Sequence, residues 1–279
     1  MTGFPRTTVG GVSLPRMIIG TNWFLGYSHT SLAKDRMIKN LQSRDRIAEI
    51  LTVFLERGVD AVMAPPSQYL EDAIRDAEDR AGRGMIRILT PSFNVRRGGP
   101  REENPKAALD QCRELGATFC LPHQRVTDAL VDRMHHVIRD VGKYARMIRK
   151  RGMIPGLSTH MPETVVYADK TGADVETYIQ IYNAAGFLMQ VEVDWVMRII
   201  RNAKKPVMTI KPLAAGRLQP VVGLAFVWNT IRDGDMVTIG TVAPDEAREA
   251  IDISLDLLDR RLTQHELQTT RSKESLAPN

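Results

Sequence analysis

The sequence predicts a single (β/α)8 barrel that begins with a short β-hairpin. Short apolar runs alternate with longer amphipathic segments eight times along the 279 residues, and no long polar linker separates the units. Such alternation is typical of parallel strands joined by right-handed helical crossovers. Eight strand–helix units in about 250 residues favour a closed barrel over an open sheet.

The elements are expected in a regular order along the chain. The hairpin is expected at residues 6–14, where Gly10 and Gly11 supply its turn. The eight strands are expected at residues 17–21, 61–64, 87–91, 118–121, 154–158, 178–181, 207–211 and 237–239. The helices between them are expected at residues 44–57, 69–81, 105–115, 126–150, 162–171, 194–202, 219–233 and 244–261.

Helix ends are marked by glycine and proline. Gly58, Gly116 and Gly152 each follow a helical run, where a residue in the left-handed conformation closes the helix. Pro162 and Pro244 occupy positions that the first turn of a helix accepts. These signals support the proposed boundaries.

The chain is expected to form one domain over residues 1–264, followed by a frayed polar tail over residues 265–279. Cys112 and Cys120 form no C-x-x-C pair. They are expected to be reduced core residues of a protein in a reducing compartment. The opening residues are too polar for a secretory signal, and no run of 18 apolar residues exists. We therefore expect a cytoplasmic protein without a membrane partner.

The charge pattern argues against a nucleic-acid partner. The net charge of +5 arises from 38 basic and 33 acidic residues that are interspersed along the helices. Nucleic-acid binding requires a concentrated basic stripe with aromatic platforms, and only 6% of the residues are aromatic. The expected partner is a small-molecule substrate, and the oligomeric state is left open.

Histidine is concentrated at one end of the predicted barrel. Residues that follow the strands gather at one face, where barrel enzymes carry their active sites. Of six histidines, His29, His123 and His160 follow predicted strands one, four and five, and Lys211 ends strand seven. Histidine can donate protons, accept them or bind metals near neutral pH. The sequence therefore predicts a histidine-rich catalytic mouth.

The last two strands are followed by a candidate anion site. The stretch KPLAAGRL spans residues 211–218 and TIGTVAPDEA spans residues 238–247. Gly216 permits close backbone approach, Arg217 can pair with phosphate, and Thr241 precedes a helix start. Alternatively, Gly216 is a turn residue and Arg217 a surface charge. The G-x-G-x-x-G and Walker patterns are both absent.

These segments, taken in order, resemble the aldo/keto reductase family. The resemblance runs over nearly the whole chain and is carried by TTVGGVSLPRMIIGTNWF, ERGVDAVMAPPSQYLEDAI, FCLPHQ, GLSTHMPE, YIQIYN and the two loops above. The family uses a tyrosine acid, a lysine–aspartate pair and a histidine. The resemblance places His123 at the histidine position, whereas Met63 occupies the aspartate position and Pro91 or its neighbour the lysine position. Tyr69 lies one residue beyond the tyrosine position, which Gln68 occupies.

The resemblance also implies a nicotinamide cofactor, NADP or NAD. It assigns eight residues to the cofactor: Ser158, Gln180, Leu213, Gly216, Arg217, Gly240, Thr241 and Glu249. Thr159 replaces the usual asparagine, and Ile210 replaces an aromatic residue that stacks on nicotinamide. Gly240 and Glu246 stand where basic residues often hold the 2′-phosphate of NADP. A preference for NADP is therefore not indicated.

Three hypotheses follow. The first is an oxidoreductase acting on a small carbonyl or alcohol with a nicotinamide cofactor, with His123 orienting or protonating the carbonyl and Tyr69 as its acid. The second is a lyase, isomerase or hydrolase that uses His29, His123 and His160 as acid–base residues or metal ligands, with Lys211 stabilising an anion. The third is a non-catalytic binding subunit. The three histidines at one end of the barrel motivate the second hypothesis, and the loss of the aspartate and lysine of the tetrad motivates the third.

Overall fold

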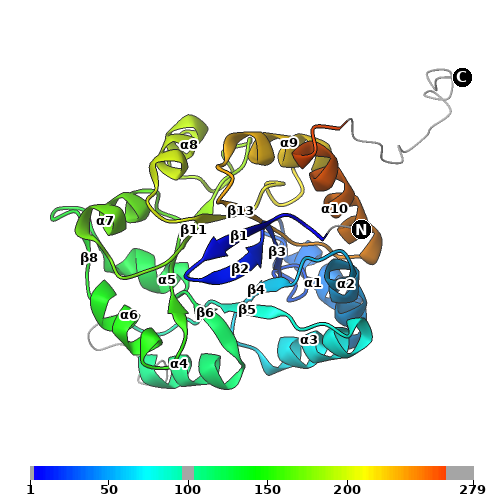
Figure 1. The fold of residues 1–279 in the computed structure, drawn as a ribbon, viewed down its shortest axis with the longest axis horizontal. Coiled ribbons are helices and arrows are strands. Elements are labelled where there is room, and N and C mark those ends of the chain that lie inside the picture. Colours follow the sequence, from blue (N-terminus) through cyan, green and yellow to red (C-terminus); the bar gives the residue numbers. More distant parts are fainter. Residues whose placement is uncertain (1–2, 96–103, 262–279) are drawn as a thin grey trace, which may run out of the picture.

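The chain folds into a barrel of parallel strands whose amino-terminal end is closed by a hairpin. The computed structural model describes residues 3–95 and 104–261. Strands β1 (Arg6–Val9) and β2 (Val12–Pro15) pair antiparallel. The turn at Gly10 and Gly11 requires positive φ at both positions. In Figure 1 this hairpin lies across the centre of the ring, and its Val9 and Leu14 pack with residues inside the barrel.

The barrel is a closed ring of parallel strands. In chain order the strands are β3 (Met17–Gly20), β4 (Ala61–Ala64), β5 (Ile86–Leu89), β6 (Ala117–Cys120), β9 (Ile154–Pro155), β10 (Leu157–Thr159), β11 (Tyr178–Ile181), β12 (Val207–Ile210) and β13 (Met236–Ile239). The ring closes because β13 pairs with β3, while β9 pairs with β6 and β10 with β11. The (β/α)8 barrel and the hairpin are therefore confirmed, and β9 and β10 are the two halves of the fifth strand.

The fifth strand is divided at Gly156. A Cβ atom at this position would lie 2.7 Å from the Leu121 side chain and 2.8 Å from the Thr177 carbonyl oxygen. Only glycine lets the two neighbouring strand ends approach so closely. The break allows one strand to pair with β6 through its first half and with β11 through its second half.

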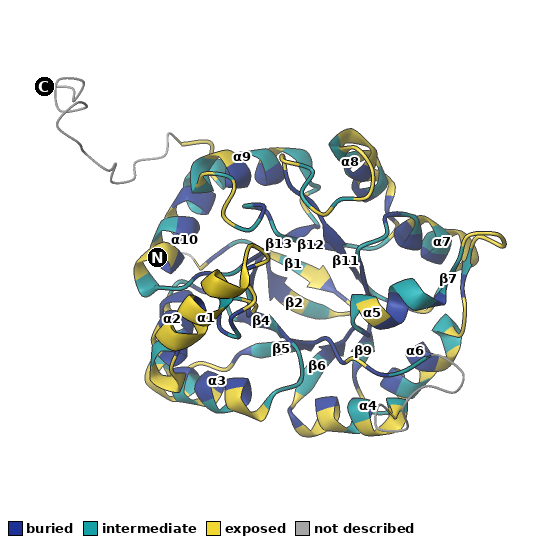
Figure 2. Ribbon diagram, turned by 180° about the vertical axis from the view of Figure 1, so that it is seen from behind, coloured by how far each residue is buried: buried dark blue, intermediate teal, exposed yellow. Residues whose placement is uncertain are grey.

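Helices surround the ring, as Figure 1 shows. They are α1 (Leu32–Leu41), α2 (Arg44–Glu56), α3 (Gln68–Ala81), α4 (Pro105–Glu114), α5 (Gln124–Thr127), α6 (Val141–Arg149), α7 (Glu163–Thr171), α8 (Val193–Asn202), α9 (Pro220–Thr230) and α10 (Pro244–Leu258). Figure 2 shows that their buried faces turn toward the strands and their exposed faces outward. Within the described residues, no helix is both long and apolar enough to cross a membrane.

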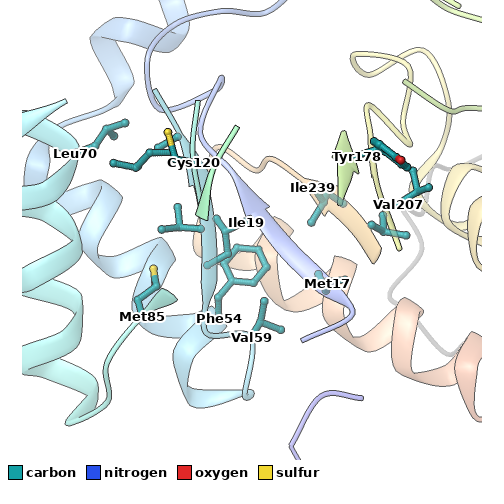
Figure 3. Packing of buried hydrophobic residues seen from close by; sticks show 14 of the residues in the cluster. Met17, Ile19, Phe54, Val59, Leu70, Met85, Cys120, Tyr178, Val207 and Ile239 are labelled. Atoms are coloured by element: carbon teal, nitrogen blue, oxygen red, sulfur yellow. The ribbon is translucent and has the colours of Figure 1, made fainter. Parts of the chain in front are cut away.

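Two apolar layers hold the ring. Figure 3 shows part of the outer layer, in which Phe54 of α2 lies beside Ile19 of β3 and Val59. The inner layer fills the barrel itself and includes Phe119 and Met208. The strands are thus buried on both faces, which is typical of parallel sheets.

The predicted helix at residues 126–150 is wrong. This segment contains α5, a 3-10 turn at Asp128–Leu130, a small hairpin of β7 (Val131–Asp132) and β8 (Val137–Ile138), and α6. The Asp132 carboxylate accepts hydrogen bonds from the backbone N–H groups of Met134 and His135, which stabilises a turn instead of a helix. His135 and His136 therefore lie in a hairpin turn.

Helix α1 was not predicted from the sequence. Its first turn is capped by Ser31, whose hydroxyl accepts the Lys34 N–H at 3.2 Å. The expected tail at residues 265–279 and the last three residues of the expected domain lie outside the described residues.

Replacing Gly156 with alanine should destabilise the protein by about 1–3 kcal/mol, because the added methyl group overpacks the contact with Leu121 and the Thr177 carbonyl. Urea unfolding followed by circular dichroism measures this loss. Gly84→Ala is the matched control, since the nearest neighbour of its added methyl group would be a Glu78 oxygen at 3.8 Å, an ordinary van der Waals distance, and it should change stability by less than about 1 kcal/mol. Equal stabilities of the two variants would contradict the role of Gly156.

Candidate active site at the carboxyl ends of the strands

Four ionisable side chains from four different loops converge at the carboxyl-terminal mouth of the barrel. Lys211 follows β12, His29 lies in the segment between β3 and α1, His123 precedes α5, and His160 follows β10. The positive charge of Lys211 acts on all three histidines. Because charge interactions weaken with separation, the four groups share one environment.

Lys211 is held at the mouth in a constrained backbone conformation. Its φ of 62° lies in the left-handed region, which is uncommon for a residue with a side chain. Its Nζ lies 2.9 Å from His29 Nε2. Within residues 3–95 and 104–261, the salt bridges of the chain include none to Lys211. Burial without a carboxylate partner lowers the pKa of Lys211 to about 8.

His29 accepts a hydrogen bond from Lys211 through Nε2, because its other ring nitrogen, Nδ1, donates to a backbone carbonyl. Nδ1 lies 3.2 Å from the carbonyl oxygen of Tyr27, which can only accept, so Nδ1 carries the proton and Nε2 presents a lone pair. Although His29 is exposed at the rim, partial desolvation of its ring and then the Lys211 charge lower its pKa. The loop is fixed by Asp35 of α1, whose carboxylate accepts from the backbone N–H and the hydroxyl of Ser28.

His123 is oriented as a hydrogen-bond donor. It caps α5, where its Nδ1 accepts the backbone N–H of Arg125 at 3.3 Å. The neutral ring therefore carries its proton on Nε2. Burial, followed by the charges of Arg125 and Lys211, lowers the pKa of His123, so the ring is neutral near pH 7.

His160 is the most strongly perturbed of the three rings. Burial lowers its pKa to about 4, aided by the charges of Lys211, His123 and His29. Its backbone N–H donates to Asp128 Oδ2 at 3.1 Å, and the neighbouring Thr159 hydroxyl donates to Asp128 Oδ1 at 2.5 Å. Asp128 thus positions the His160 loop. The sequence analysis missed it because it expected this position inside a regular helix.

The loop after β12 uses its amide groups internally. The carbonyl oxygen of Leu213 accepts the N–H groups of Gly216, Arg217 and Leu218 at 2.9–3.2 Å. The Arg217 guanidinium lies 4.0 Å from the centre of the Phe187 ring. These amides are therefore not directed at a ligand, and Arg217 remains an exposed cation at the rim.

Unpaired polar atoms gather around the end of β13. Gln42 Oε1, Thr238 Oγ1 and Thr241 Oγ1 are buried and have no hydrogen-bond partner among the described residues, as is also true of Gln180 Oε1 on β11. Gln42 is anchored there because its amide nitrogen donates to the Val242 carbonyl at 3.0 Å. Buried polar atoms without partners are costly, so these atoms can accept or donate hydrogen bonds to water or to a polar ligand. The sequence analysis missed Gln42, since no motif marks it.

The start of α10 is acidic. The Glu246 carboxylate accepts the Val242 N–H at 2.8 Å, and Asp245 is exposed beside it. Glu249 lies half-buried one turn further along. Gly240 packs closely, since a Cβ there would meet Trp23 at 2.8 Å.

Of the other predicted residues, Tyr69 and Gln180 lie away from this group, whereas Ser158 faces the inside of the barrel. Tyr69 is 45% exposed in the first turn of α3, and no hydrogen bond joins it to the described residues of the mouth. Ser158 pairs in register with Ile179, which belongs to the inner layer. Gln180 is the next residue of β11, so it faces the outer side of the strand, away from the barrel interior.

The histidines do not form a metal centre in this arrangement. Across the described ranges, no three histidine, cysteine, aspartate or glutamate side chains are placed to hold a metal ion.

The comparisons with known proteins concern the fold. No protein-family model matches the chain, and no curated protein matches its sequence. Its structure is similar to a protein assigned as an aldo-keto reductase from Pseudomonas aeruginosa, with TM-score 0.63 and 14% identity over 91% of this chain and 96% of that chain. It is also similar to an aldo-keto reductase from Brucella melitensis, with TM-score 0.58 and 14% identity over 95% of each chain. A third is aldo-keto reductase AKR11C1 from Bacillus halodurans, with TM-score 0.56 and 12% identity over 95% of this chain and 99% of that chain. The resemblance stated from the motifs therefore holds for the fold.

Substituting Lys211 with methionine should raise the pKa of His160 from about 4 toward its ordinary value of 6.5, because a nearby positive charge is removed. NMR titration of the imidazole protons measures this change. Lys205→Met is the control, since Lys205 pairs with Glu176 instead, and it should leave the pKa of His160 unchanged. An unchanged His160 pKa in the Lys211 variant would show that the two groups do not share one environment.

Proposed function

We propose that this chain is an oxidoreductase of the aldo/keto reductase type that interconverts a small carbonyl compound and its alcohol. The observation that carries this proposal is His123, which presents a neutral ring with its Nε2 proton at the mouth of a barrel of this fold. The resemblance places the same residue at the family's histidine position.

His123 supports this reaction through its protonation state. A neutral Nε2–H donates a hydrogen bond to a carbonyl oxygen and stabilises the negative charge that develops on it. An imidazolium would surrender its proton too readily and would repel Lys211. The lowered pKa of His123 therefore suits a donor that polarises the carbonyl at neutral pH.

Lys211 supplies the proton in this proposal. With a pKa of about 8, it is largely an ammonium at pH 7 and can stabilise an alkoxide and then protonate it. His29 lies against Nζ and is exposed at the rim. It can return a proton from solvent to Lys211. This pair replaces the family's tyrosine and its assisting lysine, which the chain lacks.

The residues around β13 fit a nicotinamide dinucleotide without a 2′-phosphate. When bound, such a cofactor supplies the hydride. Gln42 Oε1 can only accept, and the Thr241 hydroxyl lacks a partner, so both suit ribose hydroxyl or amino groups. The Glu246 carboxylate at the start of α10 repels an additional phosphate. NAD is therefore the proposed cofactor in preference to NADP.

We also propose that the protein acts in the cytoplasm as a single-domain enzyme on a small molecule. Cys112 and Cys120 are both free and buried, which suits a reducing compartment. Nucleic acid and membrane are not among its proposed partners, because its charges are interspersed.

Titration with NADH should quench tryptophan fluorescence and raise the melting temperature, because Trp23 packs against Gly240 beside the proposed site. NADPH should bind at least tenfold more weakly. Glu246→Arg should reduce this preference to less than about threefold, since it exchanges a repelling charge for an attracting one. Glu49→Arg makes the same charge change on the exposed face of α2 and should keep the preference. Absence of both quenching and stabilisation would overturn the proposal.

The same assay separates catalysis from binding. With 4-nitrobenzaldehyde as a test carbonyl, His123→Ala should bind NADH within twofold of the unmodified protein. Its kcat should fall by at least about 100-fold, the size of effect expected for a positioned acid–base group. Unchanged turnover in this variant would remove His123 from the mechanism.

A further inference from the structure

We propose that the Nζ of Lys211 is a nucleophilic amine that condenses with small aldehydes and 2-oxo acids to form an imine. This covalent activity goes beyond carbonyl reduction and does not require a nicotinamide cofactor. It rests on where Lys211 lies and on what surrounds it.

Among the described residues, the amine of Lys211 contacts a histidine ring and not a carboxylate. Lysines in proteins usually stay ionised through contact with carboxylates or water. Lys205, for comparison, lies 3.6 Å from Glu176. Lys211 instead places Nζ 2.9 Å from the Nε2 lone pair of His29. A neutral imidazole orients the amine by accepting a hydrogen bond but, unlike a carboxylate, adds no negative charge that would hold it as an ammonium.

The charged groups around Lys211 also affect its protonation state. The titratable and charged groups around Lys211 and its partner His29 are His123, His160, Arg217 and Asp35. His123 and His160 are neutral rings, and Arg217 is a cation. The carboxylate of Asp35 is directed to the Ser28 backbone N–H and hydroxyl. The environment therefore disfavours the ammonium form of Lys211.

The fraction of Lys211 in the neutral, nucleophilic form is larger than that of an ordinary lysine. With a pKa of about 8, roughly one-tenth of Lys211 is neutral at pH 7, compared with roughly one in three thousand for a lysine at its ordinary value of 10.5. The reactive form is thus about 300 times more abundant than in an ordinary lysine. This excess predicts selective reaction at one position of the chain.

The chemistry balances without a redox partner. The neutral amine adds its electron pair to the carbonyl carbon and forms a C–N bond, while the C=O π pair moves to oxygen. His123 Nε2–H stabilises the developing oxyanion, and the surplus nitrogen proton passes through His29 to the oxygen to give a neutral carbinolamine. The nitrogen pair then expels hydroxide, which takes one solvent proton and leaves as water. The product is an iminium of Lys211.

The class of carbonyl follows from the rim. Arg217 is exposed beside the mouth and the described mouth residues include no carboxylate that faces Lys211. A carbonyl compound with an anionic group is therefore attracted, and a 2-oxo acid or a small aldehyde acid is the expected class.

The test is reductive trapping with glyoxylate and sodium cyanoborohydride, which reduces the iminium to a stable secondary amine. Peptide mass spectrometry then locates the modified lysines. At pH 7.5 Lys211 should be labelled at least tenfold faster than the exposed Lys34 or the paired Lys205, with half-maximal labelling rate near pH 8. Labelling of Lys211 no faster than of Lys34, or no labelling at all, would overturn the proposal.

Three variants and one cross-check with NADH sharpen the result. Lys211→Arg keeps the charge and should abolish the fast labelling, whereas Lys205→Met should retain it. His29→Ala should slow labelling of Lys211 at least fivefold, because the proton acceptor is lost. Circular dichroism verifies that each variant is folded. Fast labelling without NADH binding would refute the reductase proposal alone, and NADH binding without fast labelling would refute the imine proposal alone.

Discussion

Closure of the strand ring at the divided fifth strand is the constraint on which the rest of the molecule depends. Gly156 lets one strand pair with β6 by its first half and with β11 by its second. Because the ring is closed and all its strands are parallel, the residues that follow them meet at one mouth. Lys211, His29, His123 and His160 come from distant parts of the sequence and share an environment only for this reason.

The mouth is governed by one ammonium group without a carboxylate partner. Burial lowers the pKa of Lys211, and desolvation followed by nearby positive charge, that of Lys211 included, lowers the pKa of each histidine. The local hydrogen bonds then fix the tautomers, because the Tyr27 carbonyl and the Arg125 N–H each engage one ring nitrogen. A neutral donor, a proton acceptor and a lysine of lowered pKa result, and this combination serves carbonyl chemistry by reduction or by imine formation.

Much of the architecture could be predicted from the sequence, since the apolar runs and the glycines that end helices record local preferences. The four mouth residues could also be placed, because His160 and Lys211 directly follow strands and His29 and His123 lie in the loops that follow β3 and β6. The segment 126–150 could not, since Asp132 and the left-handed His136 and Asp140 override its helical periodicity.

The roles of particular polar residues were hidden for another reason. Gln42 and Asp128 contribute through contacts with Val242 and His160, and no local pattern in the sequence records such long-range pairs. The register of β10 and β11, which separates Ser158 from Gln180, likewise depends on the tertiary pairing of strands.

The central claim is that Lys211 is a partly buried amine without a carboxylate partner among the described residues. NMR titration of lysine side chains labelled with ¹³C at Cε, with Lys211→Arg to assign the resonance, measures its pKa directly. The account predicts that the Lys211 signal titrates near pH 8. A Lys211 signal that titrates at the ordinary value of 10.5, or above it, would contradict the account.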